Sequence, residues 1–306
     1  MRLARRSPSV FALVTSLILV ASVAHAGTLV PDPVKTGARD QFGGTGNADY
    51  FAWTQDVGGT NRLSVWVDPV VGSSFKVNGA GTGFSGAVDQ TGSKLAWQHI
   101  RHNTSDVKLY DMATQTNVPL PSGINTSGWE WGAGVFGNMF TFSRTTNSAF
   151  KLYLVTDLST GAKIKYATIN RPKVDIYGPP RLYGNWIVWS TISAHGWKAY
   201  RYDIGNALTQ KIPNPLGKFY YAPSVDVAGN VYFIRSGNGC GASLRLMKWP
   251  TAGGNPTILY SFDNQTDVVY TSVFDDGLGG AVTVYVDFLD CTAASFNSDI
   301  YSFSIP

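Results

Sequence analysis

A short apolar stretch that ends near an aromatic or branched residue recurs along this 306-residue chain. The matched positions, spaced 44, 45, 47 and 45 residues apart, are Trp53, Trp97, Phe142, Trp189 and Ile234. A sixth stretch, "AVTVYV", follows after a slightly longer interval. Self-similarity at a fixed period of this length is the mark of a repeat protein, and it limits the fold more strongly than any other feature of the sequence.

Each repeat of about 45 residues contains four short strands, which we denote A to D in chain order. A small-residue segment ending in a turn such as "LYGN" or "VAGN" precedes the apolar stretch, and its glycine supplies the positive φ of a tight hairpin. A further strand ends in a turn such as "DLSTG", where the aspartate bonds to the backbone beyond it. Four-stranded sheets arranged around an axis form a β-propeller, because each sheet needs its neighbours to bury its faces. The chain is therefore predicted to be an all-β, six-bladed β-propeller with four antiparallel strands per blade.

The composition agrees with an all-β fold. Charged residues make up only 14% of the chain and aromatic residues 13%, and Glu130 is the single glutamate. Glutamate favours helices and is depleted in strands, so its scarcity fits the prediction.

The last repeat, ending in "DIYSFSIP", stops after its third strand. We expect the segment Thr28–Pro31 to complete the last blade, which would close the ring and cover an exposed edge.

The N-terminus has the pattern of a secretory signal peptide. A positive start is followed by the apolar run "VFALVTSLILVASVA" and the small-residue site "AHA", so we predict that residues 1–26 are removed and that 27–306 form a single propeller domain. The mature protein is then exported, to the periplasm or outside the cell, without a transmembrane segment. Three of the 24 basic residues lie in the first six positions, and the remaining 21 nearly balance 20 acidic residues. A basic face for nucleic acid is not indicated.

The two cysteines, Cys240 and Cys291, fall in corresponding B–C loops of neighbouring blades. In an exported protein such a pair predicts one disulfide, with two free buried thiols as the alternative. The histidines of the mature chain, His99, His102 and His195, are too scattered to predict a metal site, and no cofactor motif is present.

The repeats resemble those of the TolB-like propeller family, also described as WD40-like or PD40 repeats. The segments "DQTGSKLAWQH" and "VKLYDMATQT" are the nearest match to the family pattern, and "LYLVTDLSTG" and "AYRYDIGN" match its second half. The resemblance covers residues 40–306 and implies the propeller fold, but the chain has no room for the additional N-terminal domain of TolB itself. Family members include binding scaffolds, peptidase accessory domains and lyases, so the resemblance leaves the activity open.

In a propeller the A strands line the axis, and the D–A and B–C loops share the rim that usually binds ligands. When the repeats are aligned on their turns, the A strands place a circle of aromatic side chains at this rim. The neighbouring Glu130 and Arg181 complete the candidate binding site. Its residues are Phe84, Trp129, Glu130, Trp131, Tyr177, Arg181, Tyr221 and Tyr270. These aromatic side chains either wall a funnel or pack between blades, and Glu130 either faces the channel or forms an ion pair with Arg144 or Arg181.

No nucleophile, metal or nucleotide motif is present, so we favour a non-enzymatic, exported, monomeric scaffold that binds a protein or an envelope polymer at this rim. Two alternatives remain open. One is a hydrolase or lyase that acts on a glycan or small molecule with Glu130 as acid or base. The other is a lectin-like module that stacks sugars on the aromatic ring.

Overall fold

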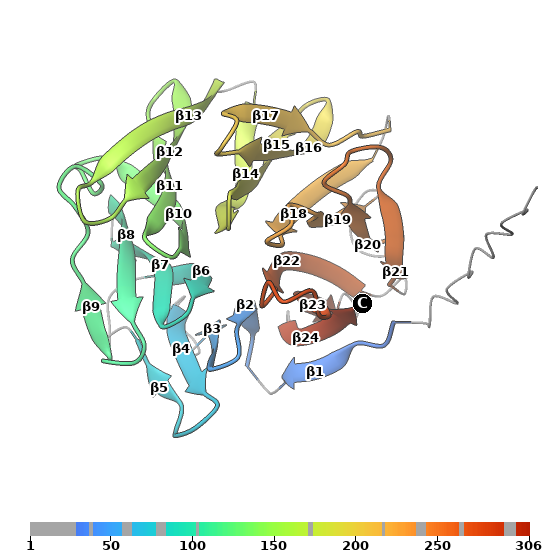
Figure 1. Ribbon diagram of the computed structural model, residues 1–306, viewed down its shortest axis with the longest axis horizontal. Coiled ribbons are helices and arrows are strands. Elements are labelled where there is room, and N and C mark those ends of the chain that lie inside the picture. Colours follow the sequence, from blue (N-terminus) through green and yellow to red (C-terminus); the bar gives the residue numbers. More distant parts are fainter. Residues whose placement is uncertain are drawn as a thin grey trace, which may run out of the picture.

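The computed structural model describes residues 29–306 apart from nine short segments: 37–38, 57–62, 78–83, 102–103, 171–173, 216–217, 237–242, 263–265 and 291–297. In this part of the chain the regular elements are strands arranged as sheets around a central axis, which is a β-propeller (Figure 1). The strands nearest the axis are β2, β6, β10, β14, β18 and β22. The described residues contain no helix that could span a bilayer.

Four of the sheets contain four strands each. The first is formed by β2 (Gln41–Gly46), β3 (Tyr50–Asp56), β4 (Leu63–Pro69) and β5 (Phe75–Lys76). The next contains β14 (Val174–Tyr183), β15 (Trp186–Ser193), β16 (Gly196–Asp203) and β17 (Leu208–Lys211). It is followed by β18 (Phe219–Val225), β19 (Val231–Ser236), β20 (Arg245–Trp249) and β21 (Thr257–Ser261). The last sheet contains β22 (Thr266–Phe274), β23 (Val282–Asp290), β24 (Ser298–Ile305) and β1 (Asp32–Lys35).

The other eight described strands form one sheet rather than two separate blades. They are β6 (Phe84–Thr91), β7 (Lys94–Arg101), β8 (Thr104–Asp111), β9 (Thr116–Val118), β10 (Trp129–Phe136), β11 (Met139–Thr145), β12 (Ala149–Asp157) and β13 (Ala162–Asn170). Strands β6 to β9 pair in chain order, as do β10 to β13, and the two groups are joined where Trp129 pairs in parallel with Ser105. The pairing thus gives four separate four-stranded sheets and one sheet of eight, instead of six separate blades.

The N-terminal segment closes the ring, as expected, but by a slightly later strand. Of the predicted segment Thr28–Pro31, the described residues 29–31 lie outside any strand, and β1 instead pairs antiparallel with β24. Lys35 at the end of β1 forms an ion pair with Asp68 of the first sheet, and its ammonium lies 4.5 Å from the centre of the Trp53 ring. These two contacts link the last sheet to the first and favour the later strand.

Every innermost strand shifts register where it pairs with the second strand of its sheet. In four of these strands the shift contains a residue with positive φ: Gly43, Gly132, Gly178 and Ala222. Such bulges insert residues that have no partner, and they interrupt the alternation of side chains along the strand. Near the axis, the alternation of residues along a strand therefore does not predict the face of the sheet on which a side chain lies.

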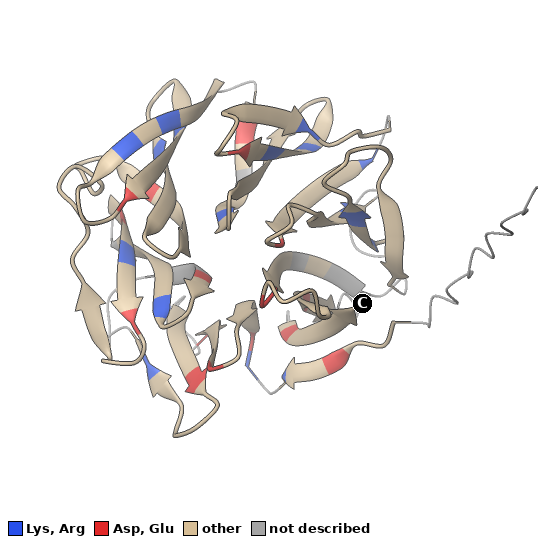
Figure 2. Ribbon diagram, in the orientation of Figure 1, with Lys and Arg blue, Asp and Glu red and all other residues tan. Residues whose placement is uncertain are grey.

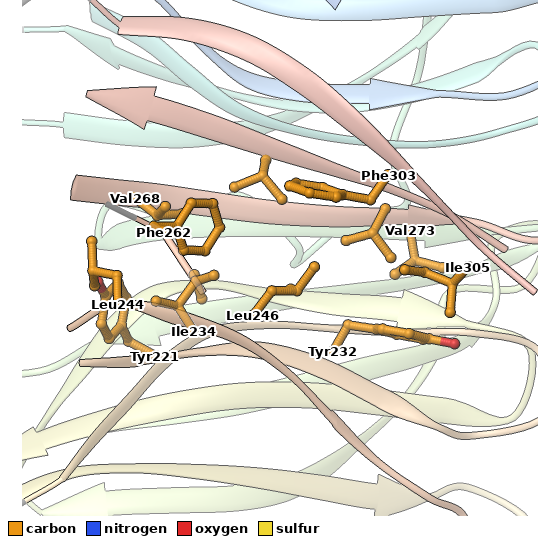
Figure 3. Close-up of a cluster of buried hydrophobic side chains, with 13 residues drawn as sticks. Tyr221, Tyr232, Ile234, Leu244, Leu246, Phe262, Val268, Val273, Phe303 and Ile305 are labelled. Atoms are coloured by element: carbon orange, nitrogen blue, oxygen red, sulfur yellow. The ribbon is translucent and has the colours of Figure 1, made fainter. Parts of the chain in front are cut away.

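Apolar side chains fill the space between neighbouring sheets. Figure 3 shows the cluster between the sheet β18–β21 and the last sheet, where Phe303 and Val273 on one side face Tyr232 and Leu246 on the other. These four side chains are at most 8% exposed. The residues before the closing strand extend this cluster, because the partly buried Leu29 packs against it.

A buried arginine joins the two sheets that precede the last one. Arg201 on β16 is 1% exposed, and its guanidinium lies between the rings of Trp186 and Trp249, 4.9 and 4.2 Å from their centres. It donates hydrogen bonds to the Gln210 side chain and to backbone carbonyls of the following sheet, those of Gly229 and Thr251.

Basic and acidic residues are distributed around the whole ring rather than gathered on one sheet (Figure 2).

Candidate functional site

Two of the predicted aromatic residues pack inside the molecule. Tyr221 is 4% exposed and its ring lies edge-on to Trp197, with centres 5.1 Å apart. Tyr270 stacks on Phe42 across neighbouring inner strands, with centres 6.4 Å apart and 21° between the planes. The side chains of Phe84 and Tyr177 are not among those described, although their backbones lie in β6 and β14.

Trp129 and Trp131 differ sharply in exposure. Trp129, the first residue of β10, leaves 41% of its surface open to solvent. Trp131 donates from its indole nitrogen to Thr145 Oγ1 at 3.1 Å and packs edge-on against Phe150, in the cluster shared with the next sheet. Among the predicted aromatic residues whose side chains are described, Trp129 is therefore the one that is exposed at the surface.

Glu130 is fully buried and forms an ion pair with Arg144 on the adjacent strand, at 2.7 Å between Oε1 and Nε. Thr126 donates to the same carboxylate twice, from Oγ1 at 2.6 Å and from its backbone nitrogen at 3.2 Å. Arg144 also donates to the carbonyl of Ile124 at 2.8 Å. Of the alternatives open for Glu130, the structure gives the ion pair with Arg144, and it does not bring Arg181 to this carboxylate.

This network fixes the segment that leads into β10. The segment is held by Glu130 and Arg144 on one side, while the Ser105 hydroxyl donates to the Glu130 carbonyl at 2.6 Å. The backbone on both sides of Trp129 is thus anchored, which presents the exposed indole on a rigid base.

Arg181 lies instead near the axis, with carboxylates from two other sheets. It is 4% exposed, and it interacts electrostatically with Asp89 on β6 and with Asp287 on β23. Asp89 accepts a hydrogen bond from the Leu182 nitrogen at 3.3 Å, and Asp287 accepts one from the Gly43 nitrogen at 2.6 Å. Side chains and backbone from four inner or second strands therefore meet at this point.

Burial changes the ionisation of both carboxyl groups. Loss of solvation raises the pKa of Asp89 to about 6 and that of Asp287 to about 7, although Arg181 and the backbone N–H donors act in the opposite direction. Burial and the nearby Asp287 also raise the pKa of Tyr270, against a smaller lowering by Arg181. These groups form one electrostatic cluster, which we call the axial cluster: Asp89, Arg181, Tyr270 and Asp287.

The axial cluster predicts that stability falls as the pH rises from about 4 to about 7. The folded chain holds the Asp287 proton at pH values where the unfolded chain has lost it, so folding binds protons and is favoured by acid. Asp287→Asn keeps an acceptor for Gly43 but cannot ionise. We expect it to match the original chain at pH 3, where the carboxyl group is protonated in both the folded and the unfolded chain, and to be more stable at pH 8, by up to about 4 kcal/mol.

Urea unfolding at both pH values measures this difference. The control is Asp49→Asn, which makes the same replacement at an exposed position outside the axial cluster. Equal stability of Asp287→Asn and the original chain at pH 8 would contradict the assignment.

A second contact between non-neighbouring sheets lies where the inner strands end. The Tyr183 hydroxyl, on β14, donates to the carbonyl of Asp275, which follows β22. The Asp275 side chain accepts from the Val227 nitrogen at 3.2 Å, just after β18. Three inner strands are thereby joined at the end opposite to Trp129.

The described residues contain no group of three or more His, Cys, Asp or Glu side chains placed to hold a metal ion. Cys240, Cys291 and His102 lie outside the described residues, so the predicted disulfide is not visible in them.

Asp89 and Asp287 were not predicted to lie near the axis. Both lie in strands of otherwise apolar or small residues, as "GAVDQ" and "VYVDF" show. A carboxylate within such a strand is a signal that could have found them, because buried charges need partners. Because the bulges interrupt the alternation of side chains, the sequence pattern does not show which residues lie together near the axis.

A scan of the sequence against protein-family models gives no match, and neither does a comparison with curated proteins. Solved structures share the fold. TolB from Acinetobacter baumannii is 15% identical, with a TM-score of 0.55 over 84% of this chain and 64% of that protein. A prolyl endopeptidase is 12% identical, with a TM-score of 0.56 over 86% and 42%. An oligogalacturonate lyase in complex with manganese is 10% identical, with a TM-score of 0.53 over 92% and 97%.

This chain thus spans less than two thirds of the TolB and endopeptidase structures that it resembles. Identities of 15% or lower establish the fold and not the chemistry. The fold of the chain is a TolB-like β-propeller.

Proposed function

We propose that the protein is an exported propeller scaffold that binds a protein or an envelope polymer with the rim around Trp129. The observation that carries the proposal is the 41% exposed indole of Trp129, held on an anchored backbone. Exposed, rigid aromatic side chains supply much of the energy of protein interfaces and also stack on sugar rings. One of the similar propellers is TolB and others belong to a peptidase and a lyase, so the fold alone does not select a reaction. Binding at the rim requires no catalytic group, and we therefore prefer it.

We do not extend the proposal to catalysis by Glu130. Its carboxylate is fully buried and both oxygens accept hydrogen bonds from within the chain. A general acid or base must reach a substrate atom directly or through one water molecule. The arrangement therefore supports an anchoring role for Glu130.

Export, blade count and the disulfide are parts of the same proposal. The N-terminal pattern supports removal of residues 1–26, leaving 27–306 as one domain. Counting the eight-stranded sheet as two repeats, joined only where Trp129 meets Ser105, would give six blades. Cys240 and Cys291 follow β19 and β23, the second strands of neighbouring sheets, which supports their pairing in an oxidising compartment. We further propose that the unit is a monomer.

Replacing Trp129 by alanine tests the binding proposal. We expect a loss of affinity for retained envelope proteins or isolated envelope polymer of about tenfold or more, since truncating an interface anchor costs about 2 kcal/mol. The melting temperature changes little because the indole is half exposed. The measurement is retention of both fractions on the immobilised mature protein.

Leu208→Ala is the matched control, because Leu208 is 51% exposed on β17, away from Trp129. Undiminished retention by the Trp129 variant, or retention of nothing by the original protein, would count against the proposal. Retention of the polymer fraction alone would support the lectin-like function instead.

A further inference from the structure

A row of hydrogen-bond donors crosses the sheet β18–β21. Tyr220 on β18 is paired with Arg235 on β19, Arg235 with Arg245 on β20, and Arg245 with Ser261 on β21. Residues paired in register lie on the same face of a sheet, with Cβ atoms about 5 Å apart. We call these four residues the arginine row.

The two arginines stand directly opposite each other, an arrangement that is unfavourable for like charges. Both side chains are partly buried, which weakens screening by solvent. Arg235 donates to the phenol of Tyr220, a neutral partner that does not balance its charge. Among the described residues, the ion pairs within 4.0 Å involve Lys35, Lys108 and Arg144, and neither arginine of the row.

A second row of paired residues in this chain also has two opposed cations, but it includes a carboxylate that balances the positive charge. In the β10–β13 strands, Glu130 is paired with Arg144, Arg144 with Lys151, and Lys151 with Thr168. This is again a sequence of two opposed cations that ends in a hydroxyl. Here, however, the inner strand supplies a carboxylate, which pairs with Arg144 at 2.7 Å.

Glu130 and Tyr220 occupy equivalent places in their strands. Each immediately precedes the last residue paired before the bulge, which is Trp131 in β10 and Tyr221 in β18. The sheet β18–β21 therefore has the two cations of the pattern but a phenol where the other row has its acid. The negative charge that balances Arg144 has no counterpart in the arginine row.

Among the described residues, buried side chains close one flank and the inner end of the row. Phe233 and Met247, two residues further along the same strands and on the same face, are buried in the cluster shared with the preceding sheet. Tyr220 is 1% exposed and closes the inner end. Arg235 and Arg245 lie at the end of β19 and the beginning of β20, on the B–C side of the sheet, and both residues are half-buried.

We propose that Arg235 and Arg245, with Tyr220 and Ser261 beside them, form a binding site for an oxyanion group, a phosphate or a carboxylate of a ligand. Guanidinium groups present paired N–H donors that match such oxygens, and two of them side by side suit a doubly charged group. The bound anion balances the positive charge of the arginine row, as the carboxylate of Glu130 balances that of Arg144. The site is separate from Trp129, so its existence does not depend on the proposed rim function.

Calorimetric titration with inorganic phosphate, at constant ionic strength set with sodium chloride, tests the proposal directly. We expect saturable binding to the mature protein and a decrease in affinity of about 10- to 100-fold in both Arg235→Gln and Arg245→Gln, as for loss of a hydrogen-bonded charged partner. A parallel titration with malonate distinguishes the two sources: the probe that binds more tightly identifies phosphate or carboxylate as the group.

The matched control is Arg39→Gln, which removes an exposed guanidinium elsewhere and leaves the affinity unchanged. Tyr220→Glu adds the acid found in the other row and is expected to abolish binding of both probes; melting curves confirm that each variant is folded. The two arginine variants keep the proposal falsifiable if the buried Tyr220 does not tolerate replacement. Absence of saturable binding to the original protein, or equal affinities in the original protein and both arginine variants, would overturn it.

Discussion

Deletion of residues 29–36 lowers the melting temperature by about 10 °C or more, at roughly 2–4 °C for each kcal/mol in a domain of this size. The deletion removes β1, so that β24 becomes an unpaired edge and the last sheet keeps three strands. It also removes the Lys35–Asp68 ion pair and the packing of Leu29 against the cluster of Figure 3. The last sheet keeps other contacts with β2, such as the Gly43–Asp287 hydrogen bond, so the deletion weakens this junction of the ring without removing it.

The control is a shorter deletion, of residues 29–31, which leaves β1 intact and costs only the contacts of Leu29. Thermal unfolding followed by circular dichroism compares the two. If the longer deletion melted at the same temperature as the shorter one, β1 would not be the closing strand.

Arg201→Ala reduces the free energy of unfolding by about 3–5 kcal/mol, because several acceptors lose a charged donor at about 1–3 kcal/mol each. The substitution leaves the carbonyls of Gly229 and Thr251 without their donor and opens a space between Trp186 and Trp249. Unsatisfied buried carbonyls and lost cation–π contacts both contribute.

Denaturant titration measures the change, and Arg201→Lys separates charge from shape. Lysine retains the positive charge but cannot reach the two carbonyls and Gln210 together, so it recovers less than half of the loss. Lys211→Ala, at an exposed position on the same sheet, is the control and stays within about 0.5 kcal/mol of the original. A similarly small effect for Arg201→Ala would show that the two sheets do not depend on this side chain.

The sequence predicts the propeller because its determinants are local and repeated. Trp53, Trp97, Phe142 and Trp189 recur at a nearly constant interval, and each marks a second strand whose apolar face packs against a neighbouring sheet. Turn residues and strand lengths repeat with them. The closing strand was placed a few residues too early, because its position depends on a contact of Lys35 with Trp53 and Asp68, which the N-terminal sequence alone does not contain.

The environment of Glu130 illustrates the limit for individual sites. Alternation correctly separates it from Trp129 and Trp131, but its partner depends on which of two arginines lies opposite in register, and this becomes evident only when β10 is paired with β11. For the axial cluster even alternation fails. Asp89 and Arg181 follow bulges in their strands, so their directions are set by inserted residues, and they meet from sheets far apart in sequence.

The contacts that cross the axis also affect how the molecule loses its structure. In a repeat protein whose units contact only the next unit along, one end can fray while the rest stays ordered. Here Asp89 on β6 reaches Leu182 past the strands β10–β13, and Tyr183 reaches Asp275 past the sheet β18–β21. Detaching any one sheet therefore disturbs the sheets beyond its neighbours, which makes melting of the ring an all-or-none event rather than a progressive unzipping.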